Sequence, residues 1–224
     1  MRELAAIVIP CFGADRHMTE LALIRHAWRE LPGFSLVFAG PDGMDENGLK
    51  AAFPGCTVYK FDASFFEDRK SYTSLTLKED FYDIFGWSEF ILLFEPSTFI
   101  VKNQLHYWCK QGYDYIAGND GCLSLRNVDR FRSHTKKNRR EIHRFLSGNG
   151  TITSDHPFWE KKSKGIWPSL RSPTRIVSTY FSRPLAYHLA APGHQELPFA
   201  LTGIDIHSEA HSQWLKAREQ HKDI

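Results

Sequence analysis

The stretch AAIVIP at residues 5–10 decides the fold class, because a short apolar, β-branched run closed by proline is typical of a buried strand. Apolar side chains recur at helical spacing through residues 19–31 and predict an amphipathic helix. Residues 34–39 and 57–61 predict two further strands, with a short helix between them at residues 45–53. This alternation predicts a parallel sheet covered by helices, in which ligands bind beyond the carboxyl ends of the strands.

The rest of the chain continues this pattern less regularly. Periodicity predicts helices at residues 75–85, 103–111, 126–147 and 208–220, and strands at residues 89–93, 112–116 and 122–125. After residue 148 the pattern loosens into proline, glycine and aromatic residues until the last helix. No repeat or shift in composition marks a boundary, so we predict a single α/β domain over residues 1–224 with a mixed, mainly parallel sheet flanked by helices.

Composition excludes several classes of protein. The chain has 224 residues, of which 42% are hydrophobic and 24% charged, as in ordinary globular proteins. The formal net charge of +2 argues neither for nor against nucleic acid, and we predict no nucleic-acid partner. No apolar run has the length of a membrane span. The four cysteines are scattered without a Cys-x-x-Cys pair, which predicts reduced thiols in a cytoplasmic protein.

Four segments in the middle of the chain carry a family resemblance. They read SYTSLTL at residues 71–77, FILLFEPS at 90–97, YDYIAG at 113–118 and DGCLSLR at 120–126. In order, spacing and residue type they resemble a group of largely uncharacterised bacterial glycosyltransferase-like domains, related to the nucleotide-diphospho-sugar transferases of GT-A type. Members of that group read SYN-x-L-x-L, then QLD or QTD, then YDYIGAPW and GNGGFSLR.

The resemblance implies a GT-A-like (Rossmann-like) fold and a transferase activity. Such an enzyme moves a sugar from a nucleotide-sugar donor to a polysaccharide or glycolipid acceptor, as in bacterial polysaccharide biosynthesis. The residues expected to bind the nucleotide and donor are Pro10, Cys11, Gly13, Arg69, Ser71, Tyr72, Ser97 and Gly121. The alternative is a catalytically degenerate domain of the same fold that binds a sugar or nucleotide, or that serves as a partner of an active transferase.

The expected metal site departs from the family pattern. Ser97 stands where the family has the strand-end aspartate that the resemblance assigns to a Mn²⁺ or Mg²⁺ ion and the donor diphosphate. Glu95 lies two residues earlier, where it could serve as a substitute ligand, and Asp120 is either a second carboxylate ligand or the cap of a turn. If the metal is lost, Arg69 and Lys70 could balance the phosphate charge instead.

Asp155 and His156 occupy the positions of a Glu-Asp pair that the resemblance offers as a catalytic base. Either residue type can deprotonate an acceptor hydroxyl. The alternative is that Ser154 and Asp155 begin a helix and that His156 is exposed on the surface.

Two further groups have ordinary and functional interpretations. His207 and His211 have a spacing that could place both imidazoles on one helix face, but no third ligand follows them, and solvated histidines are favoured. The basic stretch at residues 130–144 could contact an anionic membrane surface or a lipid phosphate. A solvated basic helix is the alternative.

Overall fold

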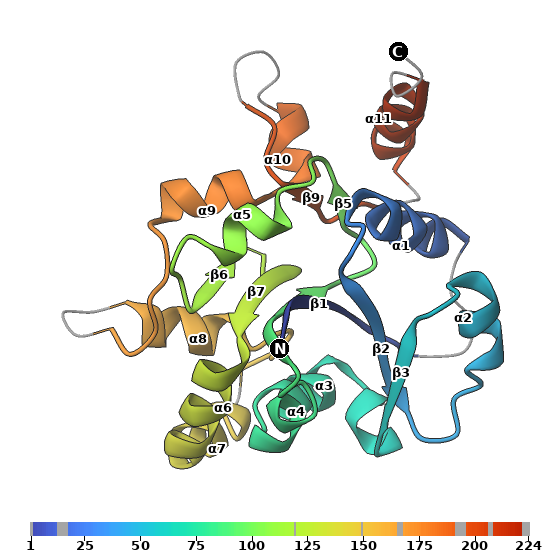
Figure 1. Cartoon of the computed structure of the whole chain (residues 1–224). Coiled ribbons are helices and arrows are strands. Elements are labelled where there is room, and N and C mark those ends of the chain that lie inside the picture. The colour runs from blue at the N-terminus through green and yellow to red at the C-terminus, as the bar shows by residue number, and fades with distance from the viewer. Residues whose placement is uncertain are drawn as a thin grey trace.

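The computed structural model describes residues 2–12, 18–118, 120–148, 150–164, 168–190, 196–205 and 208–220. Its central sheet has the strand order β3 (Thr57–Phe61), β2 (Ser35–Pro41), β1 (Glu3–Pro10), β4 (Ser88–Phe94), β7 (Leu123–Asn127) and β6 (Tyr115–Ala117). The first four of these strands run parallel, and β7 is antiparallel to both β4 and β6 (Figure 1). The predicted mixed, mainly parallel α/β sheet is confirmed.

Alternate residues of β1 supply two separate cores. Ile7 and Ile9 pack on one face of the sheet, and Ala6 and Val8 pack on the other, as the two-residue period of a strand requires. The Ile7 face is covered by α1 (Met18–Glu30), α2 (Asn47–Ala52), α5 (Leu105–Cys109) and α9 (Arg175–Phe181). The Val8 face is covered by a 3-10 helix (Ala63–Phe66), α3 (Arg69–Thr76), α4 (Glu79–Asp83), α6 (Val128–Lys137), α7 (Arg139–Leu146) and α8 (His156–Ser163).

A second, smaller sheet joins the later part of the chain to the first core. It consists of β5 (Phe99–Ile100), β9 (Ala200–Thr202) and β8 (Ser182–Pro184), with α10 (Leu185–Ala190) following β8. The last helix, α11 (Glu209–Gln220), lies near α1 (Figure 1) and packs Trp214 edge-on against Phe99, with ring centroids 5.3 Å apart. The sequence pattern did not predict this sheet, nor α9 and α10, because these elements are short and lack a clear period. The alternative that a helix begins at Ser154 and Asp155 is confirmed to within a residue, since α8 starts directly after Asp155.

Two predicted helices are wrong in their extent. Residues 75–85 form parts of α3 and α4 rather than one helix, because Lys78 is extended and starts a new helix. The helix α3 begins earlier than predicted, at Arg69, because the Asp68 carboxylate accepts a hydrogen bond from the backbone N–H of Ser71 at 2.7 Å and caps it. The basic stretch is likewise two helices, α6 and α7, separated at Asn138, and Arg126 belongs to β7.

The remaining predicted strands and helices are confirmed to within a few residues. The four cysteines are free thiols, as expected. Across the described ranges, no helix is both long and apolar enough to cross a membrane. β1 lies between β2 and β4, so the chain winds outward from β1 in both directions and leaves a crevice at the carboxyl ends of β1 and β4.

Candidate functional site

A small polar cavity lies where β1 and β4 end. Six residues that the sequence nominated line it: Pro10, Arg69, Tyr72, Glu95, Gly121 and Asp155. The cavity itself measures about 30 Å³, which is room for about two water molecules. A nucleotide-sugar is far larger, so only one group of such a ligand fits inside and the rest would lie over the mouth.

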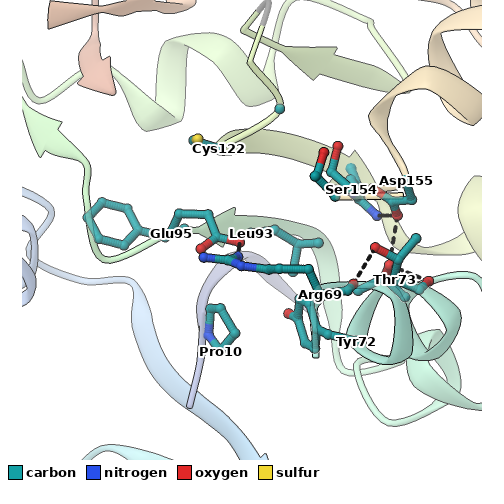
Figure 2. Close-up of a pocket in the computed structure, with 14 residues that line it drawn as sticks. Pro10, Arg69, Tyr72, Thr73, Leu93, Glu95, Cys122, Ser154 and Asp155 are labelled. Atoms are coloured by element: carbon teal, nitrogen blue, oxygen red, sulfur yellow. Dashed lines mark hydrogen bonds and ion pairs between the residues drawn. The ribbon is translucent and has the colours of Figure 1, made fainter. Parts of the chain in front are cut away.

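An ion pair crosses this cavity. Arg69 at the start of α3 places its Nη1 2.7 Å from Oε1 of Glu95, which follows β4. Figure 2 shows the Arg69 side chain extending across the cavity to Glu95, with Tyr72 near its base and Pro10 to one side. The guanidinium also lies over the ring of Phe12, 4.8 Å from its centroid. Glu95 is therefore neutralised by a cation from another element of the fold.

Asp120 caps a turn, which was one of the two roles predicted for it from the sequence. Its Oδ1 accepts the backbone N–H of Cys122 at 3.1 Å, and its Oδ2 accepts the hydroxyl of Thr202. Both oxygens are thus engaged. Among the described residues, no three His, Cys, Asp or Glu side chains are grouped so that they could hold a metal ion. The donor set of Glu95, Ser97 and Asp120 does not fit a Mn²⁺ or Mg²⁺ site.

Asp155 forms part of a buried polar cluster below the cavity. Its two carboxylate oxygens accept hydrogen bonds from Nη1 and Nη2 of Arg126 at 2.6 and 2.7 Å. Oδ2 also accepts from Thr76 Oγ1 at 2.8 Å and from Trp159 Nε1 at 3.0 Å. Arg126 further donates to the hydroxyl of Tyr82 at 2.9 Å. Both oxygens of the Asp155 carboxylate are therefore engaged by donors of the protein itself.

His156 differs from its neighbour Asp155, because it points into a second cavity of about 70 Å³. It is partly buried, and its Nδ1 lies 2.7 Å from the hydroxyl of Tyr115. Burial lowers the pKa of the imidazole below its usual 6.5, which keeps the ring neutral. Burial likewise raises the pKa of the Tyr115 phenol far above 10, so Tyr115 stays protonated. The interpretation of His156 as a solvated surface residue is therefore wrong.

Gly121 separates the two cavities. It has a φ of 71°, and a Cβ atom built on it would lie 2.8 Å from Cβ of His156. Only glycine combines this left-handed backbone with so close an approach. The loop after β6 is thereby packed directly against the start of α8.

Tyr72 presents an unsatisfied group to the first cavity. The residue is only 7% exposed, and its hydroxyl has no hydrogen-bond partner within the part of the chain that the structure describes. Burial raises the pKa of this phenol well above 10. A buried hydroxyl without a partner is unusual, and a bound ligand oxygen would satisfy it.

Three other residues that the sequence predicted to bind the nucleotide and donor lie outside the lining of the first cavity, namely Cys11, Ser71 and Ser97. Cys11 is buried, and its backbone N–H donates to the carbonyl of Ala39 at 2.8 Å. The carbonyl of Ser97 accepts from Ile204 at 2.9 Å, and the backbone N–H of Ser71 donates to Asp68. Gly13 lies outside the described residues.

Sequence reasoning missed Phe12 and Arg126. Phe12 lies two residues after the end of β1, is 37% exposed and packs edge-on against Tyr72, with centroids 5.1 Å apart. An aromatic residue two positions after the strand-ending Pro10 was the available signal. Arg126 stood inside a quoted motif, but only the fold shows that it is buried against Asp155.

The remaining nominated groups are largely structural. His211 is buried and its Nδ1 accepts the backbone N–H of Asp205 at 2.9 Å, whereas His207 lies outside the described residues. In the basic stretch, four residues form ion pairs with carboxylates: Arg130 with Asp114, Arg132 with Asp83, and Lys136 and Arg139 with Glu79.

A family model described as "Protein of unknown function (DUF5672)" matches residues 55–202, about two thirds of the chain. The chain belongs to this family. The match covers most of the segments that line the first cavity in this DUF5672 protein. No curated protein matches the chain closely enough to count as a relative.

Solved glycosyltransferases share the fold of the DUF5672 protein at low sequence identity. The apo form of glycosyltransferase GlyE from Streptococcus pneumoniae TIGR4 is 10% identical with a TM-score of 0.65, over 96% of this chain and 59% of that one. The chain thus spans well under two thirds of GlyE. Galactosyltransferase LgtC, solved with donor and acceptor sugar analogues, is 11% identical with a TM-score of 0.63, over 96% and 94% of the two chains. Mouse xyloside xylosyltransferase 1 is 11% identical with a TM-score of 0.59, over 91% and 98%. The chain therefore has a GT-A-like, nucleotide-sugar-transferase-like fold.

Proposed function

We propose that this DUF5672 protein is a glycosyltransferase that moves a sugar from a nucleotide-sugar donor to a carbohydrate acceptor, namely a bacterial polysaccharide or glycolipid. The observation that carries the proposal is the polar cavity at the crevice between β1 and β4, which contains Arg69 and the unsatisfied hydroxyl of Tyr72. Ligands of open α/β sheets bind at such a crevice. The GT-A-like fold supports a nucleotide-sugar as that ligand.

The donor would lie along the ends of β1 and β4. The exposed ring of Phe12 offers a surface on which a nucleobase can stack, since aromatic faces bind bases with little sequence preference. The diphosphate would then lie over Arg69, next to Tyr72.

The acceptor would lie on the side of His156. Nδ1 of this residue lies 2.7 Å from the Tyr115 hydroxyl, and in the tautomer that carries its proton on Nδ1 the imidazole would donate to Tyr115 and leave Nε2 to accept a proton from an acceptor hydroxyl. Because its pKa is below 6.5, the imidazole is neutral near pH 7 and available as a base. The hydrogen bonds of Asp155 assign it a supporting role instead.

Thermal denaturation in the presence of nucleotides tests this proposal. A ligand that binds only the folded chain raises its Tm. We expect one of UDP, GDP, CMP or dTDP to raise the Tm, and Phe12→Leu to diminish that shift. Tyr107→Leu is the matched control, since Tyr107 is an exposed aromatic residue on α5, away from the cavity. If no nucleotide raises the Tm, the nucleotide-sugar proposal is wrong.

A degenerate binding module is the second candidate, and one observation favours it. Ser97 replaces the strand-end aspartate of the family pattern, while Glu95 is occupied by Arg69. A binding module and an enzyme both give a thermal shift. Slow hydrolysis of the matching nucleotide-sugar distinguishes them, because only an active transferase releases sugar to water, and His156→Gln should then reduce that rate.

A further inference from the structure

We propose that the diphosphate of the donor binds here without a divalent cation, because Arg69 leaves Glu95 and supplies the positive charge itself. This inference rests on the proposed function, and it gives Glu95 a new role: it is the counter-ion that holds Arg69 in the empty site. It replaces the expectation that Glu95 is a metal ligand.

The Arg69–Glu95 pair is suited to exchange. A single short hydrogen bond joins Nη1 to Oε1, and the Arg69 side chain is 53% exposed. The Glu95 side chain is 19% exposed, so the open side of the pair is the guanidinium, where a ligand anion can reach Arg69 and compete with the carboxylate. The guanidinium has five N–H donors, and phosphate oxygens accept two of them in parallel.

Tyr72 provides a second donor on the same helix. It follows Arg69 by three residues on α3, which places both side chains on one face, and both line the cavity. Tyr72 is 7% exposed as a residue, and its hydroxyl is buried and has no hydrogen-bond partner within the described ranges. A phosphate oxygen bound to Arg69 would supply the missing acceptor.

The carboxylates do not offer a competing cation site. Glu95 is bonded to Arg69, and both oxygens of Asp120 accept hydrogen bonds from Cys122 and Thr202. The other cation in the lining, Arg126, is already neutralised by Asp155. Arg69 is therefore the cation in this lining that a ligand anion can bind in exchange for a single hydrogen bond to a carboxylate, while its guanidinium stays beside the ring of Phe12.

Glu95→Gln distinguishes the two roles of Glu95 by the sign of its effect. Binding of UDP, GDP, CDP, dTDP and inorganic pyrophosphate is measured by calorimetry in EDTA and again with excess Mn²⁺. We expect wild-type protein to bind one nucleotide equally well in both buffers. Glu95→Gln releases Arg69 and should tighten binding about threefold or more, whereas Arg69→Gln should weaken it about tenfold or more.

A control variant and the two buffers test the metal-free anion site separately from the transferase activity. Asp83→Asn removes the counter-ion of Arg132 in a similar exposed pair remote from the cavity, and should leave nucleotide affinity unchanged. Circular dichroism checks that each variant is folded. Binding that requires Mn²⁺ and is lost in Glu95→Gln would overturn the metal-free site but leave the transferase proposal standing. Absence of all nucleotide binding, with pyrophosphate still bound more tightly by Glu95→Gln, would support the anion site and overturn the donor.

Discussion

Among single residues, Asp155 shows how one side chain can be necessary without taking part in chemistry. It lies at the start of α8, yet its carboxylate accepts from a strand, a preceding helix and its own helix. A buried ion pair adds little stability compared with an apolar pair, but its loss exposes the remaining charge to an apolar interior. The cluster therefore fixes the position of α8, and with it that of His156.

Asp155→Asn should lower the free energy of unfolding by about 3–5 kcal/mol, because it leaves the buried guanidinium of Arg126 without a counter-ion. Urea denaturation measures this loss. Asp129→Asn is the matched control, since Asp129 pairs with Arg2 on the surface and its replacement should change stability little. Equal losses in the two variants would contradict the structural role of Asp155.

Stability should fall as the pH is lowered below 6.5. Burial lowers the pKa values of His156 and His134 in the folded chain. The unfolded chain then binds more protons than the folded chain, so the stabilisation is complete above 6.5 and is lost as the pH falls towards the folded pKa values. Carboxylates such as Glu160, whose pKa is lowered from 4.5, lose their contribution only in stronger acid. Urea midpoints at about pH 7.5 and about pH 5.5 measure the effect.

The variant His156→Gln should reduce this pH dependence, and adding His134→Gln should reduce it further. His106→Gln is a control on the exposed surface of α5. An unchanged dependence in the double variant would show that other groups determine it.

The sequence predicted which residues line the candidate site better than it predicted which of them pair with one another. The motif segments contained Tyr72, Glu95 and Gly121, Arg69 was nominated as a nearby cation, and the fold brings these four together. The motifs could not show that Glu95 meets Arg69, because the two residues come from separate elements that only the sheet order brings into contact. That pairing changes the chemistry expected of Glu95.

Among the elements, the strands and α1 were predictable because each has a clear apolar period. β3 has the predicted bounds Thr57–Phe61, whereas the short elements α9 and α10 had no period to detect. Helix boundaries within basic or mixed segments depended on caps and local breaks at Lys78 and Asn138. Such breaks change the backbone at a single residue, so the amino-acid composition of the segment does not reveal them.

The helices α6 and α7 should not hold the protein on membranes. After four of their basic residues pair with carboxylates, Lys137, Arg140 and Arg144 are exposed, and the described part of the chain has no ion pair for them. About 1 kcal/mol per cation gives about 3 kcal/mol, which is weaker than millimolar binding.

We therefore expect the protein to remain in the supernatant when phosphatidylglycerol-containing vesicles are sedimented at physiological salt. Arg132→Gln, which removes a paired cation, serves as the comparison for a Lys137→Gln, Arg140→Gln, Arg144→Gln triple variant. Firm sedimentation that only the triple variant abolishes would show that this surface is a membrane contact.

At the scale of the whole molecule, the central sheet is shared by both cores. β1 and β4 each contribute side chains to the apolar clusters on both faces of the sheet. We therefore expect the two clusters and the sheet between them to unfold together. The smaller sheet is joined to the first core through Ile100 and Ala200. That the chain forms one domain over residues 1–224 stays a prediction.

A single cooperative unfolding transition is the expected outcome for the whole chain. Far-UV circular dichroism and tryptophan fluorescence should give the same urea midpoint, because tryptophans such as Trp108 and Trp159 lie on opposite faces of the sheet. Two separated transitions, or probes with different midpoints, would show that the smaller sheet and its helices form an independent unit.

The contact between Arg126 and Asp155 also constrains how this protein can diverge. The two residues are 29 positions apart, and a mutation in either one alone passes through an intermediate with an uncompensated buried charge. Relatives should consequently keep both residues or replace both, with few sequences carrying one without the other. Neutral change at these two positions is in effect a single step that requires two mutations, whereas the Arg69–Glu95 pair, whose arginine is open to solvent, can be altered one residue at a time.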